Sequence, residues 1–181
     1  LTNIALQMMG RVPVNLNYTA SAETMAAAAR QAEIEHVITS KAFLERLPLE
    51  VPGNPVYLED IMASVTKKDR IIAALIALLV PVKHVESFLG APPNRSEHDL
   101  ATIIFSSGSE GEPKGVMLTH LNIMSNIDTM ATTFDHRVGH PIMGILPFFH
   151  SFGFTVTLWA GLIEGVGGVF HPNPQIGRAH V

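Results

Sequence analysis

The stretch that decides the fold runs from Leu100 to His120 and reads LATIIFSSGSEGEPKGVMLTH. An apolar run ends in a loop of serines and glycines, and a second apolar run follows from Val116 to Leu118. Gly108 and Gly111 let successive backbone N–H groups converge on an anion. Side-chain donors add to the loop, namely the hydroxyls and ammonium of Ser106, Ser107, Ser109 and Lys114. The pattern therefore predicts a strand, a phosphate-binding loop and a second strand.

This loop is not a Walker loop, because Pro113 precedes the lysine and Gly115 follows it, where that motif needs glycine and then serine or threonine. It resembles instead the phosphate-loop signature [ST]-S-G-[ST]-T-G-x-P-K-G of the adenylate-forming (AMP-binding) superfamily. The residues that fall on signature positions are Ser106, Ser107, Gly108, Ser109, Gly111, Pro113, Lys114 and Gly115. The alternative is a serine and glycine surface turn with a solvated lysine.

Glu110 departs from the signature, which usually has threonine at this position. A carboxylate beside a triphosphate would repel it by roughly 1–4 kcal/mol, unless it turns outward or Mg²⁺ bridges the two groups. We expect Glu110→Thr to tighten ATP binding in a complete enzyme if the carboxylate faces phosphate. Unchanged affinity would mean that it points away.

A second group of residues follows the expected strand from Ile142 to Leu146 and precedes the expected helix from Phe152 to Leu162. This segment, LPFFHSFGFT, resembles the family segment L-P-x-x-H-x-x-G, and ligands of open parallel sheets bind at the carboxyl ends of strands. The resemblance implies that His150 is catalytic, where acyl carboxylate and ATP α-phosphate meet. It also implies that three aromatic residues wall an apolar acyl channel, namely Phe148, Phe149 and Phe152. The alternative for His150 is a structural loop histidine.

The composition excludes several classes of protein. The 181 residues are 47% hydrophobic and 15% charged, which indicates a folded chain of single-domain size. The net charge of −4 and the lack of a basic run argue against a nucleic-acid partner. Without cysteine there is no disulfide, thiolate nucleophile or cysteine zinc site. Alternating helices and apolar strands predict an α/β fold with a mostly parallel β-sheet flanked by helices.

Local signals place the remaining elements. We expect a helix from Leu1 to Met9 closed by Gly10, a strand from Val12 to Leu16, and helices capped by Ser21, Ser40 and Thr119. Two further short strands are expected at 36–39 and 56–58.

A run of ten apolar residues, Ile71 to Val80, lies in a helix expected from Lys67 to Pro81. Ten residues are about half of what spanning a bilayer requires. The helix could be buried in the core, or it could lie at a membrane interface or dock a partner, because Lys67, Lys68, Arg70 and Lys83 flank it.

The segment from Gly10 to Tyr18 resembles the G-x-x-x-x-x-x-N-Y run of fatty-acyl members of the superfamily. Together the three segments look most like the acyl-ACP synthetase / 2-acylglycerophosphoethanolamine acyltransferase branch. The resemblance implies that fatty acid and ATP, with Mg²⁺ at ligands still unassigned, give an acyl-adenylate, and that the acyl group passes to acyl carrier protein. The alternatives are a fatty acyl-CoA synthetase and a non-catalytic nucleotide- or lipid-binding module. The expected location is the cytoplasm, with the cytoplasmic face of the membrane as an alternative.

Residues 1–175 are expected to be part of the N-terminal domain of such an enzyme, because the family's adenine-binding motif and C-terminal lid domain come later. On this expectation the chain alone is inactive. Residues 176–181, IGRAHV, read like a translated sequencing adapter, so we expect native sequence to end near Gln175.

Overall fold

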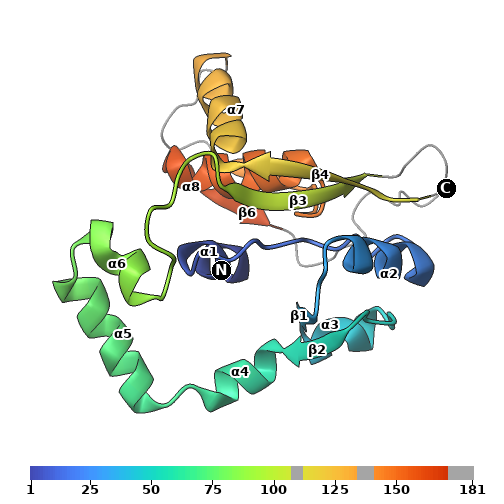
Figure 1. The fold of residues 1–181 in the computed structure, drawn as a ribbon, viewed down its shortest axis with the longest axis horizontal. Helices are drawn as coiled ribbons and strands as arrows, with labels where there is room; N and C mark the ends of the chain where they lie inside the picture. The colour runs from blue at the N-terminus through green and yellow to red at the C-terminus, as the bar shows by residue number, and fades with distance from the viewer. Residues whose placement is uncertain (107–111, 134–140, 171–181) are drawn as a thin grey trace.

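The computed structural model describes residues 1–106, 112–133 and 141–170, and Figure 1 shows their arrangement. Helices alternate with short strands, which confirms the predicted α/β class. In the described residues the strands form three separate two-stranded sheets rather than one continuous sheet. Two of the sheets, β1–β2 and β5–β6, are parallel, and β3–β4 is antiparallel.

The N-terminal helix α1, Thr2–Met8, ends before Gly10, which adopts φ +69° as a helix-terminating glycine does. The strand predicted from Val12 to Leu16 is wrong, because this segment is extended but pairs with no strand of the described chain. A side-chain hydrogen bond holds it instead: the Thr102 hydroxyl donates to the Pro13 carbonyl at 2.8 Å. The alternation of apolar residues marked a half-buried segment, not a strand.

The next elements follow their caps. The Ser21 hydroxyl accepts from the Thr24 amide at 3.2 Å and begins α2, Ala22–Gln31. The Ser40 hydroxyl accepts from the Phe43 amide at 3.3 Å and begins α3, Lys41–Arg46. Strand β1, His36–Thr39, precedes α3 in the chain, and β2, Asn54–Tyr57, follows it. The two strands pair in parallel.

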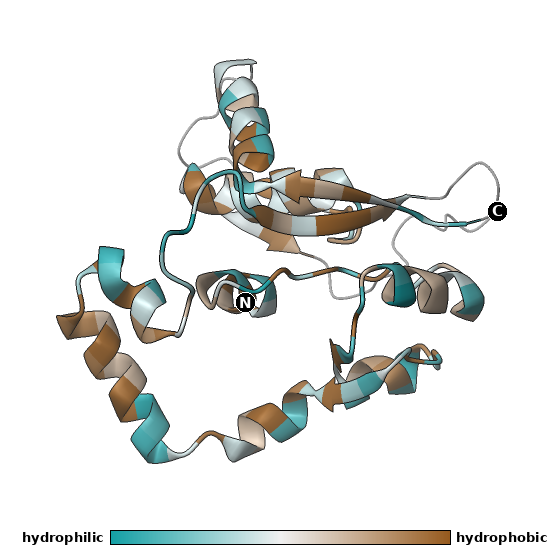
Figure 2. Cartoon of the chain, in the orientation of Figure 1, coloured by the Kyte–Doolittle hydropathy of each residue, from teal (hydrophilic) through white to brown (hydrophobic). Residues whose placement is uncertain are grey.

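Three helices then form an arm that leads away from β2 (Figure 1): α4, Leu58–Ser64; α5, Lys67–Leu79; and α6, Val82–Phe88. The chain after α6 leads to the next strand, at Leu100. A reciprocal pair of hydrogen bonds between Thr66 and Asp69 caps α5. Figure 2 shows apolar residues along α5, and none of its residues is buried; Leu78 is 79% exposed. The expectation that α5 lies in the core of this chain is therefore wrong. In the three described ranges no helix has the length and apolar character to cross a membrane.

The core lies between the hairpin and two helices. Strand β3, Leu100–Ser106, pairs with β4, Lys114–Thr119, and the Thr119 hydroxyl accepts from the Asn122 amide at the start of α7, His120–Thr133. The later elements are β5, Ile142–Gly144; a π-helix η1, Gly153–Ala160; α8, Gly161–Ile163; and β6, Gly168–Phe170. Buried residues of β3, α7 and η1 form one apolar cluster: Ala101, Ile104, Ile123, Ile127, Phe154, Leu158 and Ala160.

Candidate functional site

The ends of the predicted phosphate loop lie opposite each other. Ser106 and Lys114 are register partners across the β3–β4 hairpin, and both are exposed. The antiparallel pairing therefore brings a hydroxyl and an ammonium group to one end of the sheet, where both can donate to phosphate oxygens. The other predicted loop residues, Ser107, Gly108, Ser109 and Gly111, lie outside the described residues, as does Glu110.

The glycine after the lysine has a packing role that the sequence did not reveal. A Cβ on Gly115 would lie 3.1 Å from Phe105 Cε1 and 3.1 Å from Ile103 Cγ2. The Phe105 ring thus lies across the backbone of the partner strand beside Lys114. Glycine at this position leaves room for the Phe105 ring over the backbone of the partner strand.

His150 lies in a tight turn that leads from β5 into η1. Its amide donates to the Pro147 carbonyl at 3.0 Å, and its carbonyl accepts from the Phe154 amide at 2.9 Å. The Phe152 amide donates to His150 Nδ1 at 3.3 Å. Because Nδ1 accepts this hydrogen bond, the neutral imidazole carries its proton on Nε2, which leaves an exposed N–H donor.

The close surroundings of Gly153 explain why the turn needs a glycine three residues after His150. A Cβ at this position would lie 2.3 Å from the Pro147 carbonyl oxygen and 2.6 Å from the Leu146 carbonyl oxygen. Only a residue without a side chain lets the start of η1 approach the backbone of 146–147 so closely. The spacing between His150 and Gly153 in the motif is thus a steric requirement of the turn that holds the imidazole.

The three predicted channel phenylalanines have different environments. Phe148 packs against the core cluster and meets Phe170 edge to face, with ring centroids 6.1 Å apart. Phe148 and Phe149 both line a cavity of about 850 Å³. Phe152 is 52% exposed and is not among the described residues that line this cavity.

The opposite wall of the cavity comes from residues to which sequence reasoning gave no role. They belong to α1, to the extended segment after Gly10, to β1 and to α3, and include Asn15, Leu16, Tyr18 and Phe43. Asn17 and Tyr18 were quoted only as part of a family pattern. The sequence signal that could have identified this wall is the short run of apolar residues around Asn15. In the structure this run forms no strand.

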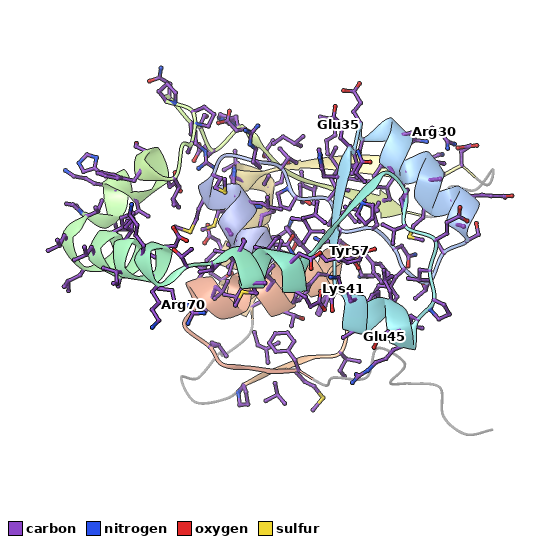
Figure 3. The ribbon with its side chains drawn as sticks, turned by 90° about the horizontal axis from the view of Figure 1, so that it is seen from below. Arg30, Glu35, Lys41, Glu45, Tyr57 and Arg70 are labelled. Atoms are coloured by element: carbon purple, nitrogen blue, oxygen red, sulfur yellow. The ribbon has the colours of Figure 1, made fainter. Side chains whose placement is uncertain are left out.

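Hydrogen bonds between polar groups stabilise the rim of the cavity at Ser40. The Glu59 carboxylate of α4 accepts from the Lys41 amide at 3.0 Å and from the Ser40 hydroxyl at 2.8 Å. These hydrogen bonds, led by the one from the Lys41 amide, lower the pKa of Glu59 to about 2. Lys41 also forms an ion pair with Asp60, and its ammonium lies 5.1 Å from the centroid of the Tyr57 ring. Figure 3 labels Lys41 and Tyr57, which lie near each other. These contacts join the start of α3 to the start of α4.

In the described part of the chain, no group of three or more acidic or histidine side chains is arranged to hold a metal ion. The Mg²⁺ ligands therefore stay unassigned. The two donors at the loop end of the hairpin, by contrast, have the chemistry that binds phosphate oxygens, since neither Ser106 nor Lys114 brings negative charge.

Comparisons with known proteins place this geometry in a family. The AMP-binding enzyme family profile matches residues 1–179. A long-chain-fatty-acid–CoA ligase of Bacillus subtilis (strain 168) is 42% identical over 72 residues, which are 39% of this chain and 13% of that protein. A medium-chain-fatty-acid–[acyl-carrier-protein] ligase, TtuA, of Teredinibacter turnerae is 32% identical over 83 residues, which are 46% of this chain and 13% of that protein. The chain thus spans about an eighth of the length of each relative.

The fold matches solved structures over most of the chain. The fatty acyl-adenylate ligase from L. pneumophila, in complex with acyl adenylate and pyrophosphate, has a TM-score of 0.67 and 18% identity, and the match covers 94% of this chain and 27% of that one. O-succinylbenzoate coenzyme A synthetase from Bacillus subtilis, in complex with ATP and magnesium ion, has a TM-score of 0.64 and 17% identity, and the match covers 94% of this chain and 32% of that one. At these identities the structures show the fold alone. The fold agrees with the sequence match, and the chain belongs to the AMP-binding enzyme family.

Proposed function

We propose that the protein containing this chain is an ATP-dependent fatty acid ligase. A carboxylate oxygen of the fatty acid attacks the α-phosphorus of ATP, the bond to the bridging oxygen breaks, and pyrophosphate leaves. The acyl-adenylate then reacts with the phosphopantetheine thiol of acyl carrier protein: a carbon–sulfur bond forms, AMP leaves, and the thiol proton goes to solvent.

This proposal rests on one observation, the different surroundings of the three consecutive residues 148–150. Phe148 and Phe149 line an apolar cavity, and the next residue presents an exposed Nε2–H donor. A fatty acid has an apolar chain that seeks such a cavity and a carboxylate that accepts from such a donor. His150 would orient the carboxylate and reduce its repulsion by the α-phosphate.

The predicted phosphate loop supplies the other half of the reaction. Ser106 and Lys114, at the two ends of the loop, would hold the β- and γ-phosphates and so stabilise the leaving pyrophosphate. Bound Mg²⁺ would neutralise phosphate charge there. The involvement of Ser107, Gly108, Ser109 and Gly111 stays a prediction from the signature.

The acceptor thiol is the finer part of the proposal. One relative is an acyl-carrier-protein ligase and the other a CoA ligase, so CoA is the alternative acceptor. Thioester formation measured side by side with purified holo acyl carrier protein and with CoA decides between them. Phospholipid acyltransferase activity stays a prediction from the branch resemblance.

The test of the ligase proposal is fatty-acid-dependent exchange of labelled pyrophosphate into ATP, measured on the complete protein. We expect His150→Ala to lower the exchange rate by about 10²-fold, as loss of an oriented donor does, while the urea midpoint changes little. His98→Ala is the matched control, because His98 is 71% exposed in the connection between α6 and β3, and its carboxylate contact, to Glu97, is long at 3.9 Å. Equal rates for the two variants, or no exchange by the wild-type protein, would contradict the proposal.

A further inference from the structure

The cavity beside Phe149 is large enough to hold a small-molecule chain. Its volume of about 850 Å³ falls in the range of roughly 300–1,000 Å³ that is usual for ligand pockets. Apolar side chains from distant parts of the sequence line it, among them Val14, Leu16, Ile38 and Leu44. The cavity opens to solvent, so its apolar lining is in contact with water, and an apolar chain bound there would remove that surface from water.

Tyr18 connects the two walls of the cavity. Its ring meets Phe43 edge to face with centroids 5.5 Å apart, and Phe149 edge to face with centroids 5.1 Å apart. Burial raises the pKa of the Tyr18 hydroxyl. Phe149, the residue before His150, is therefore in direct contact with Tyr18 of the N-terminal wall.

Asn15 marks a polar point in the lining of the cavity. Asn15 Oδ1 accepts from Asn3 Nδ2 at 3.1 Å, whereas Asn15 Nδ2 is buried with no hydrogen-bond partner in the described part of the chain. Both residues line the cavity. A buried amide donor without a partner is costly, and a hydrocarbon chain has no acceptor for it, so a water molecule would have to satisfy this group beside the chain.

We propose that this cavity receives the apolar chain of the acyl substrate, and that Leu16 and Tyr18 limit the chain length it accepts. The inference rests on the proposed function for the carboxylate end, and it adds a specificity role for the segment after Gly10. Thr102 fixes this segment through its hydrogen bond to Pro13, so the wall has a defined position.

The first test is displacement of cis-parinaric acid, a fluorescent fatty acid, from the complete protein by saturated fatty acids of increasing length. We expect affinity to rise about fourfold for each methylene that enters the cavity and then to level off. Leu16→Trp should move the plateau to shorter chains and Leu16→Ala to longer ones. Leu78→Trp, on the exposed face of α5, is the matched control and should leave the plateau unchanged.

The second test needs no variant. A fatty acid with a diazirine at the end of its chain should label residues 12–18 on irradiation, and excess decanoate should compete. Labelling confined to α5 and α6, or equal plateaus for Leu16→Trp, Leu16→Ala and the wild-type chain, would overturn the inference.

The two proposals can fail separately. If the ligase proposal fails and this inference holds, the complete protein gives no fatty-acid-dependent pyrophosphate exchange, yet residues 12–18 are labelled. If this inference fails and the ligase proposal holds, exchange occurs, His150→Ala lowers its rate by about 10²-fold, and the label appears elsewhere.

Discussion

The turn that carries His150 should fail if Gly153 gains a single methyl group. In Gly153→Ala the new Cβ would lie 2.3 Å from the Pro147 oxygen, 2.6 Å from the Leu146 oxygen and 2.9 Å from the Pro147 carbonyl carbon. All three atoms belong to the backbone, so no side-chain rotation relieves the contacts. Overpacking costs up to about 3 kcal/mol, and the higher helix propensity of alanine offsets about 1 kcal/mol of it. We expect a net loss of about 2 kcal/mol.

Urea unfolding followed by circular dichroism measures this loss. With a slope of about 2 kcal/mol per molar urea, the midpoint should fall by roughly 1 M. Gly161→Ala is the matched control, because it changes the next glycine of the same helical segment and its Cβ would come no closer than 3.5 Å to the Val166 oxygen. Equal midpoints for Gly153→Ala and Gly161→Ala would refute the steric argument, and with it the claim that Gly153 shapes the turn.

Three further predictions concern stability. Hydrogen bonds from the Lys41 amide and a neighbouring hydroxyl lower the pKa of Glu59 from 4.5 to about 2. Ionised Glu59 therefore stabilises the fold above about pH 4.5, and this contribution is lost as the pH falls toward 2. Glu59→Gln should flatten the decline in urea midpoint between these two pH values. Thr102→Val leaves the Pro13 carbonyl without its buried donor and should cost about 1–3 kcal/mol in urea unfolding, a loss that Thr102→Ser should largely avoid. Ile127→Ala should cost about 2–5 kcal/mol, because Ile127 is fully buried in the core cluster; a loss under 1 kcal/mol would mean that the cluster repacks.

Helix starts and the β3–β4 hairpin could be predicted because their signals are local. Ser21, Ser40 and Thr119 each cap the helix that the sequence assigned to them. A capping hydroxyl acts over three residues, so no knowledge of distant packing is needed. The two apolar runs around the phosphate loop are likewise adjacent in sequence, and their pairing needs only the short connection between them.

Features that depend on distant partners could not be predicted in the same way. The apolar run in α5 indicated which residues favour burial but not what would cover them, and the structure leaves Leu78 and Leu79 exposed. The segment from Val12 to Leu16 has the alternation of a strand, but the Thr102 hydroxyl, 89 residues away from Pro13, holds it in place. Gly153 was quoted as a motif position, and only the approach of 146–147 gives its physical reason.

Strand β3 contacts the wall of the cavity and also leads into the predicted phosphate loop. Gln7 Nε2 donates to the Ala101 carbonyl at 3.0 Å, and the Thr102 hydroxyl donates to the Pro13 carbonyl at 2.8 Å; both hydrogen bonds are buried. Through them β3 holds α1 and the segment after Gly10, and the same strand continues to Ser106 at the start of the loop. A reaction between a carboxylate and a phosphate requires that both be held at a fixed separation. Strand β3 contacts the proposed acyl wall near its start and the predicted phosphate loop at its end, so this one strand would hold the two reactants at a fixed separation.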